Sequence, residues 1–374
     1  MAGARNAVGF MGIRPEYEVL IGFTAISDEP TVQAVATVIR EIGAKLSLIE
    51  VPVPPLNQPW PRALEEAIKG VDYYIGMGAG PGPHSLATYI PMYDYGVSMG
   101  VIAAEPGFLE SEVALWPGRL WIEIHNRLKW QISGDQIDPG RNVEFHVTDD
   151  RGTDLRYLVK CPENLGAGIG ATPLEAGYWG DGARPRILVR AGFPPSHIPM
   201  GDLQHSAKGV LYADTSNYFG RTPEPLKLTF SGGYCTAIDG GEWAKRVWES
   251  TIGAYRNANR LREVAITLHP KMVSRAPAWQ PDAPVPLTMF ASAGLGDVVT
   301  ALGGDTGVGG VDPGYEHITT FFTTSENVTV TADGQLIVDR GRLLVLDDPA
   351  VQEFARQFGD PAELLSPAKR TADR

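Results

Sequence analysis

The sequence predicts a mixed fold, with an N-terminal α/β domain built on a parallel sheet and a C-terminal domain rich in antiparallel strands. Between residues 17 and 104, short apolar runs alternate with helical patterns, which is typical of βαβ units. After Asp138, Pro139 and Gly140 the pattern changes to short alternating strands and hairpin turns. This change predicts three segments, namely an N-terminal domain over 1–135, a C-terminal domain over 136–365 and a flexible polar tail over 366–374.

In the first domain, the clearest helix begins after Asp28. A polar cap, an acid and Pro30 stand in its first turn, apolar residues then recur at helical spacing, and Gly43 ends it. A second helix is predicted over 62–69. The predicted strands are 17–23, 45–51, 71–77 and 98–104.

A long helix over 115–132 connects the two domains. It carries Trp116, Trp121 and Trp130, and such an aromatic surface predicts burial against a second copy, so we expect a homo-oligomer. Beyond it, residues 142–157 form a hairpin signature with a turn at 149–152, and a further helix is predicted over 243–261. The remaining predicted strands are 186–189, 208–213, 226–230, 233–238, 263–268, 328–331 and 335–339.

Composition limits the classes of partner and the location that we expect for this protein. The chain has 374 residues and a net charge of -12, which argues against nucleic acid and anionic membranes as partners and leaves a small molecule as the expected substrate. No apolar run reaches the length of a membrane span, and no signal-peptide pattern is present. Its two cysteines, Cys161 and Cys235, form no CxxC pair and suit a reducing compartment, so a cytoplasmic location is expected.

A glycine-rich stretch over 303–314 runs into the apolar segment 318–322, and His317 lies at the junction. Glycines let backbone approach a ligand closely, and the strand that follows fixes the residues at its start. With Glu316 beside it and Asp312 before it, His317 is a candidate metal ligand or general base. The alternative is a loop histidine that only packs.

Further candidates stand elsewhere in the second half. A proline-stiffened loop over 193–205 carries His197 and His205. Glu263 opens an apolar strand, where it is either an edge charge or a ligand. Neither an HExxH motif nor an EF-hand spacing is present, and Ser196 lacks the GxSxG elbow of a nucleophile.

Several weak motifs follow one another in an order that resembles a known family. The matching segments are the N-terminal βαβ unit, 105–106, 147–154, 175–178, 230–241, the strand of Glu263, 308–310 with His317, and 333–335. Together they resemble the thermophilic-type metallo-aminopeptidases and, more closely, the related mononuclear iron enzymes of the 2,5-dihydroxypyridine 5,6-dioxygenase type. The resemblance covers most of the chain.

The resemblance implies a set of metal ligands that this sequence keeps only in part. The dioxygenases hold iron with two histidines and an aspartate, the second histidine and the aspartate forming an H-x-D pair. His317 matches that second histidine, Thr319 stands in place of the aspartate, and Glu263 falls where the other histidine lies and where the aminopeptidases have a glutamate. Since the loop near Pro194 lacks the further glutamate of the aminopeptidases, their two-metal site is incomplete here.

A hydroxyl is a poor third ligand. Either Glu316, Asp305 or His205 replaces the lost aspartate, or the metal is absent from this chain.

The resulting hypothesis is a metal-dependent enzyme that opens a hydroxylated N-heterocycle at a mononuclear non-heme iron site. Glu263 and His317 are the expected ligands of one divalent metal, with Fe(II) favoured and Zn or Mn as alternatives. The residues expected to orient substrate or move protons are Glu175, His197, His205, Tyr315 and Thr319. Two alternatives stay open, a metal-dependent amidase or aminopeptidase-like hydrolase and a metal-free relative that binds a small molecule.

Overall fold

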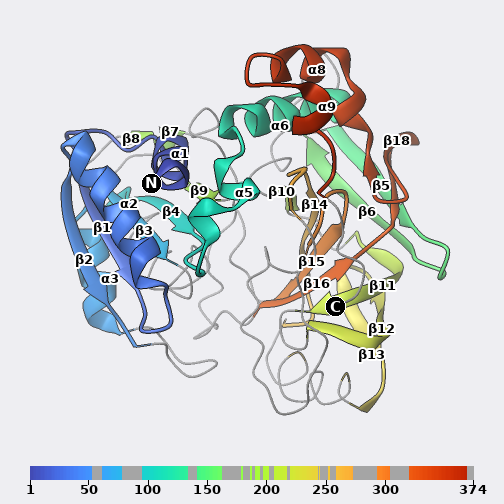
Figure 1. The fold of residues 1–374 in the computed structure, drawn as a ribbon. Coiled ribbons are helices and arrows are strands. Elements are labelled where there is room, and N and C mark those ends of the chain that lie inside the picture. The colour runs from blue at the N-terminus through green and yellow to red at the C-terminus, as the bar shows by residue number, and fades with distance from the viewer. Residues whose placement is uncertain are drawn as a thin grey trace. The chain divides into compact units, whose positions relative to one another are not determined.

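The chain forms two compact units, which are described separately (Figure 1). The computed structural model describes residues 1–52, 61–77, 95–133, 141–161, 178–179, 186–187, 190–193, 197–201, 206–216, 220–242, 244, 252, 258–272, 293–303 and 320–368. Among these, the first unit comprises residues up to Arg119 together with the described residues between 178 and 193. The second unit comprises the rest, so the helix predicted as a connector belongs to the second unit from Leu120 onwards.

The first unit is built on a five-stranded sheet in the order β2-β1-β3-β4-β9, and all its pairings are parallel. The predicted parallel sheet is thus confirmed. Its strands are β1 Glu18–Phe23, β2 Lys45–Glu50, β3 Tyr73–Met77, β4 Ser98–Ile102 and β9 Arg190–Phe193. The sequence did not predict β9, which returns from much later in the chain to pair with β4. A separate pair, β7 Tyr178–Trp179 and β8 Arg186–Ile187, is antiparallel.

Helix α2 (Glu29–Ile42) begins and ends where the sequence predicted. The side chain of Asp28 accepts a hydrogen bond from the backbone N–H of Thr31 at 3.0 Å, which satisfies one of the free donors of the first turn. Gly43 ends the helix in the left-handed conformation, with φ 95°. Helix α3 (Arg62–Lys69) also has the predicted bounds.

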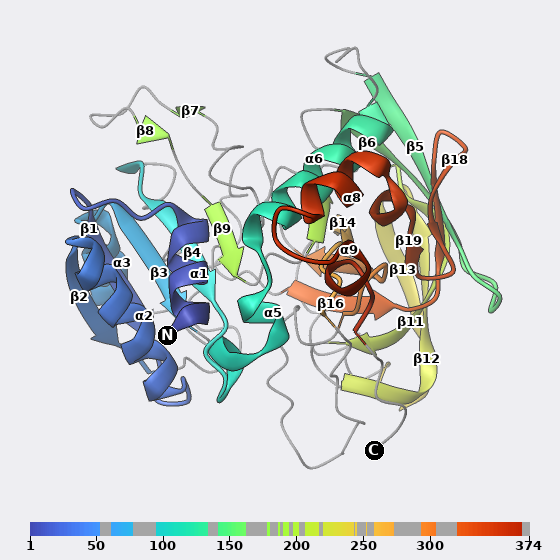
Figure 2. The same cartoon turned by 45° about the horizontal axis from the view of Figure 1, so that its top comes forward.

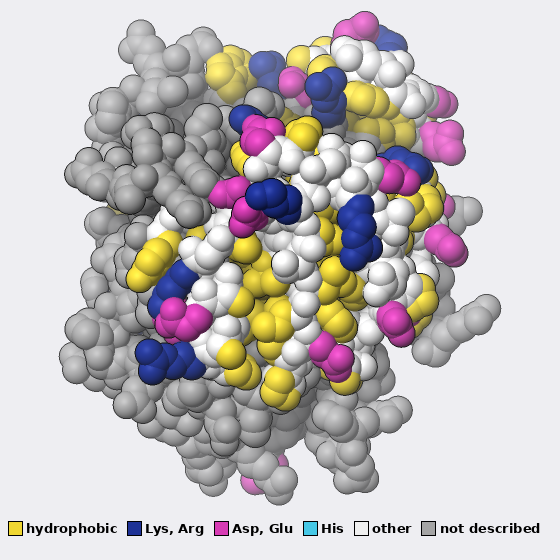
Figure 3. All heavy atoms as spheres, turned by 90° about the vertical axis from the view of Figure 1, so that its left-hand side faces the viewer, with side chains coloured by type: hydrophobic (Ala, Val, Ile, Leu, Met, Phe, Trp, Pro, Cys, Tyr) yellow, Lys and Arg dark blue, Asp and Glu magenta, His cyan; other side chains and the backbone are white. Residues whose placement is uncertain are grey.

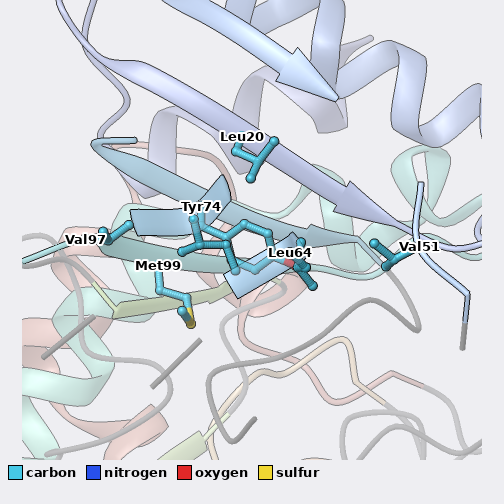
Figure 4. Packing of buried hydrophobic residues seen from close by; sticks show 7 residues of the cluster. Leu20, Val51, Leu64, Tyr74, Val97 and Met99 are labelled. Carbon is cyan, nitrogen blue, oxygen red and sulfur yellow. The ribbon is translucent and has the colours of Figure 1, made fainter. Parts of the chain in front are cut away.

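Helices cover both faces of this sheet. On one face, Leu64 of α3 packs with Leu20, Tyr74 and Met99 of the sheet in a cluster of buried side chains (Figure 4). On the other face, helix α1 (Ala2–Met11) approaches so closely that a Cβ added at Gly100 would lie 2.8 Å from the Sδ of Met11. Successive strand residues point to opposite faces, so Met99 and Gly100 mark the two layers.

The sequence analysis did not predict α1, although its buried residues Ala4, Ala7, Val8 and Met11 recur at helical spacing. Next to it lie η1 (Phe108–Glu110) and α5 (Glu112–Leu115). The side-chain amide of Asn6 donates to the backbone oxygen of Ala114 at 2.9 Å and to that of Trp116 at 2.7 Å. These bonds satisfy carbonyl groups at the end of α5.

The second unit is built on a twelve-stranded sheet whose pairings are antiparallel, which confirms the predicted β-rich half. Its path is β10-β14-β15-β16-β11-β6-β5-β17-β18-β19, with β12 and β13 added beside β11. The strands are β5 Arg141–Thr148, β6 Asp154–Cys161, β10 His197–Gly201, β11 Lys208–Ser216, β12 Gly220–Ser231, β13 Tyr234–Asp239, β14 Leu261–Thr267, β15 Val298–Gly303, β16 Thr320–Ser325, β17 Thr329–Ala332, β18 Gln335–Asp339 and β19 Arg342–Leu343.

Helices α6 (Gly118–Ser133) and α8 (Pro349–Ala355) lie side by side in both ribbon views (Figures 1 and 2). Arg127 of α6 donates from its Nε to the carboxylate of Asp348 at 2.6 Å, and Asp348 also caps α8. The short elements η4 (Leu344–Asp347) and α9 (Pro361–Leu364) flank α8. The predicted tail starts with an anchored segment, because the backbone N–H of Ala368 donates to the carbonyl oxygen of Pro270 at 2.9 Å.

The helix predicted over 243–261 is wrong at its end, since Ala258 and Asn259 form a turn and β14 begins at Leu261. Backbone hydrogen bonds to the region of β13 set this boundary between the turn and β14. The N–H of Cys235 donates to the oxygen of Asn259 at 2.7 Å, and that of Leu261 to the oxygen of Gly233 at 2.9 Å. Apart from residues 244 and 252, the stretch 243–257 lies outside the described residues.

Charged side chains of both signs are interspersed on the face drawn in Figure 3. Ion pairs of the first unit show the same mixing, including Arg5 with Glu41 at 3.0 Å and Lys45 with Glu18 at 2.8 Å. Exposed pairs of this kind contribute little stability. They do mean that the described part of this face carries no broad region of a single sign. Separately, within the described part of the chain no helix is both long and apolar enough to span a bilayer.

Candidate functional site

Strand β14 carries Glu263, the one predicted metal ligand whose side chain the structure describes. The residues that follow it, Val264, Ala265 and Ile266, are buried on both faces of the sheet. Glu263 itself is only 8% exposed. It is therefore not a solvated edge charge, which was one of the two readings of the sequence. A carboxylate in such a place needs a cation or hydrogen-bond donors to stabilise its charge.

The strand neighbours of Glu263 are small. In register with it are Gly201 on β10 and Ala301 on β15. Directly paired residues point to the same face of a sheet, so neither neighbour places a bulky side chain beside the carboxylate. Two residues further along β14, Ala265 packs with Val299 and Ala293 in a small apolar cluster. Glu263 thus has small strand neighbours on both sides and an apolar cluster next to it along β14.

Strand β16 follows directly on the segment that contains His317 and Thr319. A hydrogen bond of 2.6 Å between the hydroxyls of Thr300 and Thr323 joins it to β15 in the interior. Its first residue, Thr320, pairs with Gly303, while Ala301 pairs with Phe322. Adjacent strands are about 4.8 Å apart and residues rise about 3.4 Å, so the backbones at Glu263 and Thr320 lie roughly 12 Å apart. The start of β16 is thus in the neighbourhood of Glu263.

The other predicted site residues divide into two groups. The backbone of His197 lies on β10, where it pairs with Thr267, four positions along β14 from Glu263. The residues that lie outside the described part of the chain are Glu175, His205, Asp305, Tyr315, Glu316, His317 and Thr319. The convergence of Glu263 with His317 therefore stays a prediction. Among the described residues, no group of three His, Cys, Asp or Glu side chains is arranged to hold a metal ion.

A charged network at the far end of β16 was not predicted. Arg151 donates to Asp214 at 2.5 Å and lies 2.7 Å from the carboxylate of Asp149. The second oxygen of Asp214 accepts the backbone N–H of Glu326 at 2.8 Å, and Arg221 pairs with the Glu326 carboxylate. Glu326 follows β16 directly, so the network fixes that end of the strand. The sequence signals only the turn at Asp149 and gives no sign of its distant partners.

Burial and hydrogen bonding have opposite effects on the pKa of Asp149. Burial alone raises the pKa of this carboxyl, but hydrogen bonds from Thr153 and Arg151 outweigh it and hold the pKa below its usual value. Asp149 is therefore ionised at neutral pH. Its role is structural, because its charge is satisfied within the turn and by Arg151.

Two other buried side chains that could carry chemistry are Cys235 and His269. Burial raises the pKa of Cys235 to about 12, so its thiol is not a nucleophile at neutral pH. His269, which follows β14, is fully buried and accepts the backbone N–H of Lys271 at its Nδ1, 3.1 Å away.

Comparison with known proteins bears on the fold. No family model matches the sequence, and no curated protein does. Among solved structures, the 2,5-dihydroxypyridine dioxygenase of Pseudomonas putida KT2440 matches with a TM-score of 0.59 at 16% identity, over 91% of this chain and 95% of that one. Wild-type AmpT from Thermus thermophilus, an aminopeptidase T, matches with a TM-score of 0.58 at 15% identity, over 92% of this chain and 98% of that one.

Both matches span nearly the whole of each chain. The protein therefore has the two-unit fold shared by that dioxygenase and that aminopeptidase, as the sequence motifs indicated. At 15% and 16% identity the likeness establishes the fold and leaves the activity open.

Proposed function

We propose that this protein is a metal-dependent enzyme that acts on a small polar ring compound, with ring opening of a hydroxylated N-heterocycle as its reaction. The single observation that carries the proposal is Glu263, a carboxylate that is only 8% exposed and is followed on β14 by three buried apolar residues. The shared fold supports it, because one structural neighbour is a dihydroxypyridine dioxygenase.

The donor set fits one divalent metal. The Glu263 carboxylate would supply an anionic oxygen, and His317 a neutral imidazole nitrogen, both of which suit Fe, Mn and Zn. When bound, such an ion supplies a Lewis acid that polarises an oxygen of the substrate. The strand neighbours Gly201 and Ala301 are small, which supports a ligand position at Glu263. Fe(II) is the metal we favour for the ring-opening reaction.

The remaining predicted residues would act on the substrate directly. In this proposal Glu175 and Tyr315 hold the polar groups of the ring, while His197 and His205 move protons. Thr319 contributes a hydroxyl near the site rather than a strong ligand. The apolar wall of Ala265, Val299 and Ala293 would exclude water from one side of the ring.

The second candidate is a metal-dependent hydrolase of the amidase or aminopeptidase class. It is favoured by the equally extensive match to AmpT. In this alternative, Glu263 keeps its position and the substrate is an amide. A chain that binds a small molecule without metal is the third candidate.

Metal content separates these candidates first. The protein is purified without chelators and analysed for iron, manganese and zinc, and about one equivalent is expected. Oxygen uptake is then measured with a panel of hydroxypyridines, and amine release from amides is measured without oxygen. Uptake supports ring opening, whereas amine release under anaerobic conditions would replace it with hydrolysis. Glu144→Gln, an exposed glutamate of the same sheet, is the control for Glu263→Gln.

A further inference from the structure

A hollow lies in the second unit, and Glu263 is not among the residues that line it. It is a cavity of about 470 Å³, which is within the size range of small-molecule sites. We call it the C-terminal cavity, because the end of the described chain forms part of its wall. Its lining residues are Met272, Leu295, Asn327, Arg340, Gly341, Arg342, Leu343, Leu346, Asp347, Leu365, Pro367 and Ala368.

The lining is apolar apart from a small charged group. The charged residues of the lining are Arg340, Arg342 and Asp347. Arg342 donates a hydrogen bond of 2.6 Å to the carboxylate of Asp347. Arg340 forms an ion pair with Asp339, with 3.7 Å between its Nε and a carboxylate oxygen, and its side chain is 76% exposed, so its guanidinium group is accessible from solvent. Exposed ion pairs contribute little energy, so a ligand carboxylate can replace Asp339 as the partner of Arg340.

Arg340 occupies a backbone position that does not favour arginine. It is the first residue of the two-residue turn between β18 and β19, with φ 46°, and Gly341 follows with φ 78°. Such a turn requires positive φ at both positions and strongly prefers Asn-Gly or Asp-Gly. The preceding hairpin follows this rule, since Asp333 and Gly334 have φ 47° and 81°. Two consecutive hairpins therefore use one backbone conformation, but only the turn at the cavity carries arginine.

The position of this turn is fixed on both sides. The N–H of Gly341 donates to the oxygen of Val328 at 2.9 Å, and that of Arg340 to the hydroxyl of Thr329 at 3.3 Å. A Cβ added at Gly296 would lie 2.1 Å from the oxygen of Gly341. Because backbone meets backbone here, the turn is fixed in position, and the backbone of Arg340 is held beside the cavity. A strained residue that local preference does not explain is a candidate for a binding role.

We propose that the C-terminal cavity binds a small organic carboxylate with an apolar body. The carboxylate pairs with the guanidinium of Arg340, whose planar group of donors matches it. The apolar body lies against Leu343, Leu346 and Leu365. This site is separate from Glu263 and independent of the reaction proposed above.

Binding is measured by calorimetry with two probes of equal shape, 3-phenylpropionate and its neutral analogue 3-phenylpropanamide. The carboxylate binds the wild-type protein, and the amide binds at least about tenfold more weakly, because it lacks the charge that pairs with the guanidinium. Arg340→Asn weakens carboxylate binding by about tenfold or more and does not lower the melting temperature, since Asn is preferred in this turn. Ala368→Phe places a larger side chain in the cavity and weakens the binding of both probes.

Two variants complete the test. Arg356→Asn removes an arginine that does not line the cavity and leaves the affinity within about twofold of wild type, since binding is local. Arg340→Gly, which also tolerates positive φ, repeats the Arg340→Asn measurement if the first variant does not fold. Equal affinity for acid and amide, unchanged binding in the Arg340 variant, or no binding of the acid by wild type overturns the proposal.

Discussion

Glu263 of β14 is paired in register with Gly201 of β10, so a buried carboxylate lies next to a residue without a side chain. The pairing matters because burying an ionised carboxylate costs several kcal/mol unless another group stabilises it. A hydrophobic neighbour at position 201 would close the space beside the charge. The combination of a buried carboxylate and small neighbours is what a ligand position requires.

Replacing Glu263 by Gln tests whether this carboxylate holds a metal. The change keeps the shape and removes the charge. We expect metal content to fall below about a tenth of wild type, since metal–carboxylate bonds need the anionic oxygen. Wild type at about one hundred times the dissociation constant of the metal gains about 2.7 kcal/mol of stability, and the variant loses that gain. Melting curves with and without chelator measure this, and full metal content in the variant refutes the assignment.

Substitutions at His317 and Thr319 test the metal site by removing one expected ligand and by adding another. His317→Ala is expected to abolish metal content and turnover while the protein still unfolds cooperatively, because a site ligand is not a core residue. His317→Asn makes the same test with a smaller change in volume. Thr319→Asp adds a carboxylate and is expected to raise the affinity for metal at least about tenfold. Unchanged affinity in Thr319→Asp contradicts a third ligand position there, and activity without metal would make His317 a general base.

Much of the fold was readable from local pattern. The cap at Asp28, the stop at Gly43 and the helical spacing between them are contained within one stretch of chain, and α2 follows them. The turn at Asp333 and Gly334 specifies its hairpin in the same way. Strand β9 was not predictable, because its four residues join the sheet through a pairing with β4 about ninety residues earlier. The start of β14 at Leu261 was likewise decided by pairing with distant residues.

At the candidate site, too, local features could be predicted from the sequence and contacts between distant residues could not. Glu263 stood out as an acid at the start of an apolar strand, a local feature. Its burial could not be read from the sequence, because it depends on the strands that pair on either side. In the charged network, Arg151 contacts Asp214, which is 63 positions away, and Glu326, which is 175 positions away. No local sequence pattern predicts such distant partners.

Trp130 bears on the expected homo-oligomer. Trp116 and Trp121 are buried within the chain, whereas Trp130 is 42% exposed and lies against Arg127, whose guanidinium carbon is 4.1 Å from the ring centre. If copies associate through this helix, Trp130→Gln is expected to weaken dimerisation by about tenfold or more, since interface tryptophans contribute strongly to binding. Sedimentation at micromolar concentration measures this, with Leu158→Gln as an exposed apolar control. A monomeric wild-type protein refutes the expectation.

Gly209 and Gly334 form a matched pair for the cost of close backbone approach. Both have positive φ, 116° and 81°, so Ala strains the backbone at each position by about 1–2 kcal/mol. At Gly334 no described atom lies within 4 Å of the added Cβ, whereas at Gly209 it would lie 1.9 Å from the oxygen of Asp154. We expect Gly209→Ala to cost about 3 kcal/mol or more, because the overlap adds to the strain. Denaturant titrations that give equal costs would contradict this view of the β6–β11 contact.

Asp348 links the stability of the second unit to pH. Its side chain is 7% exposed, and it accepts hydrogen bonds from Arg127 at 2.6 Å and Gln131 at 3.1 Å while capping α8. Burial alone raises the pKa of Asp348, but these bonds outweigh it, so the pKa in the folded protein is below its usual value. A carboxyl with a depressed pKa contributes stability that is present above the unfolded value of about 3.9 and is lost as pH falls through the folded value.

Asp348→Asn isolates the charge, because Asn caps a helix about as well as Asp. At pH 7 we expect a loss of about 1.5–3 kcal/mol, the range for a hydrogen bond to a charged group. The loss should shrink as pH falls below about 4, since the wild-type carboxyl is then protonated as well. Asp360 caps α9 by accepting the N–H of Ala362 at 3.0 Å, and Asp360→Asn should therefore cost little. Unfolding free energies between pH 2.5 and 7 decide the matter, and a loss in Asp348→Asn that is independent of pH contradicts the role of the Arg127 pair.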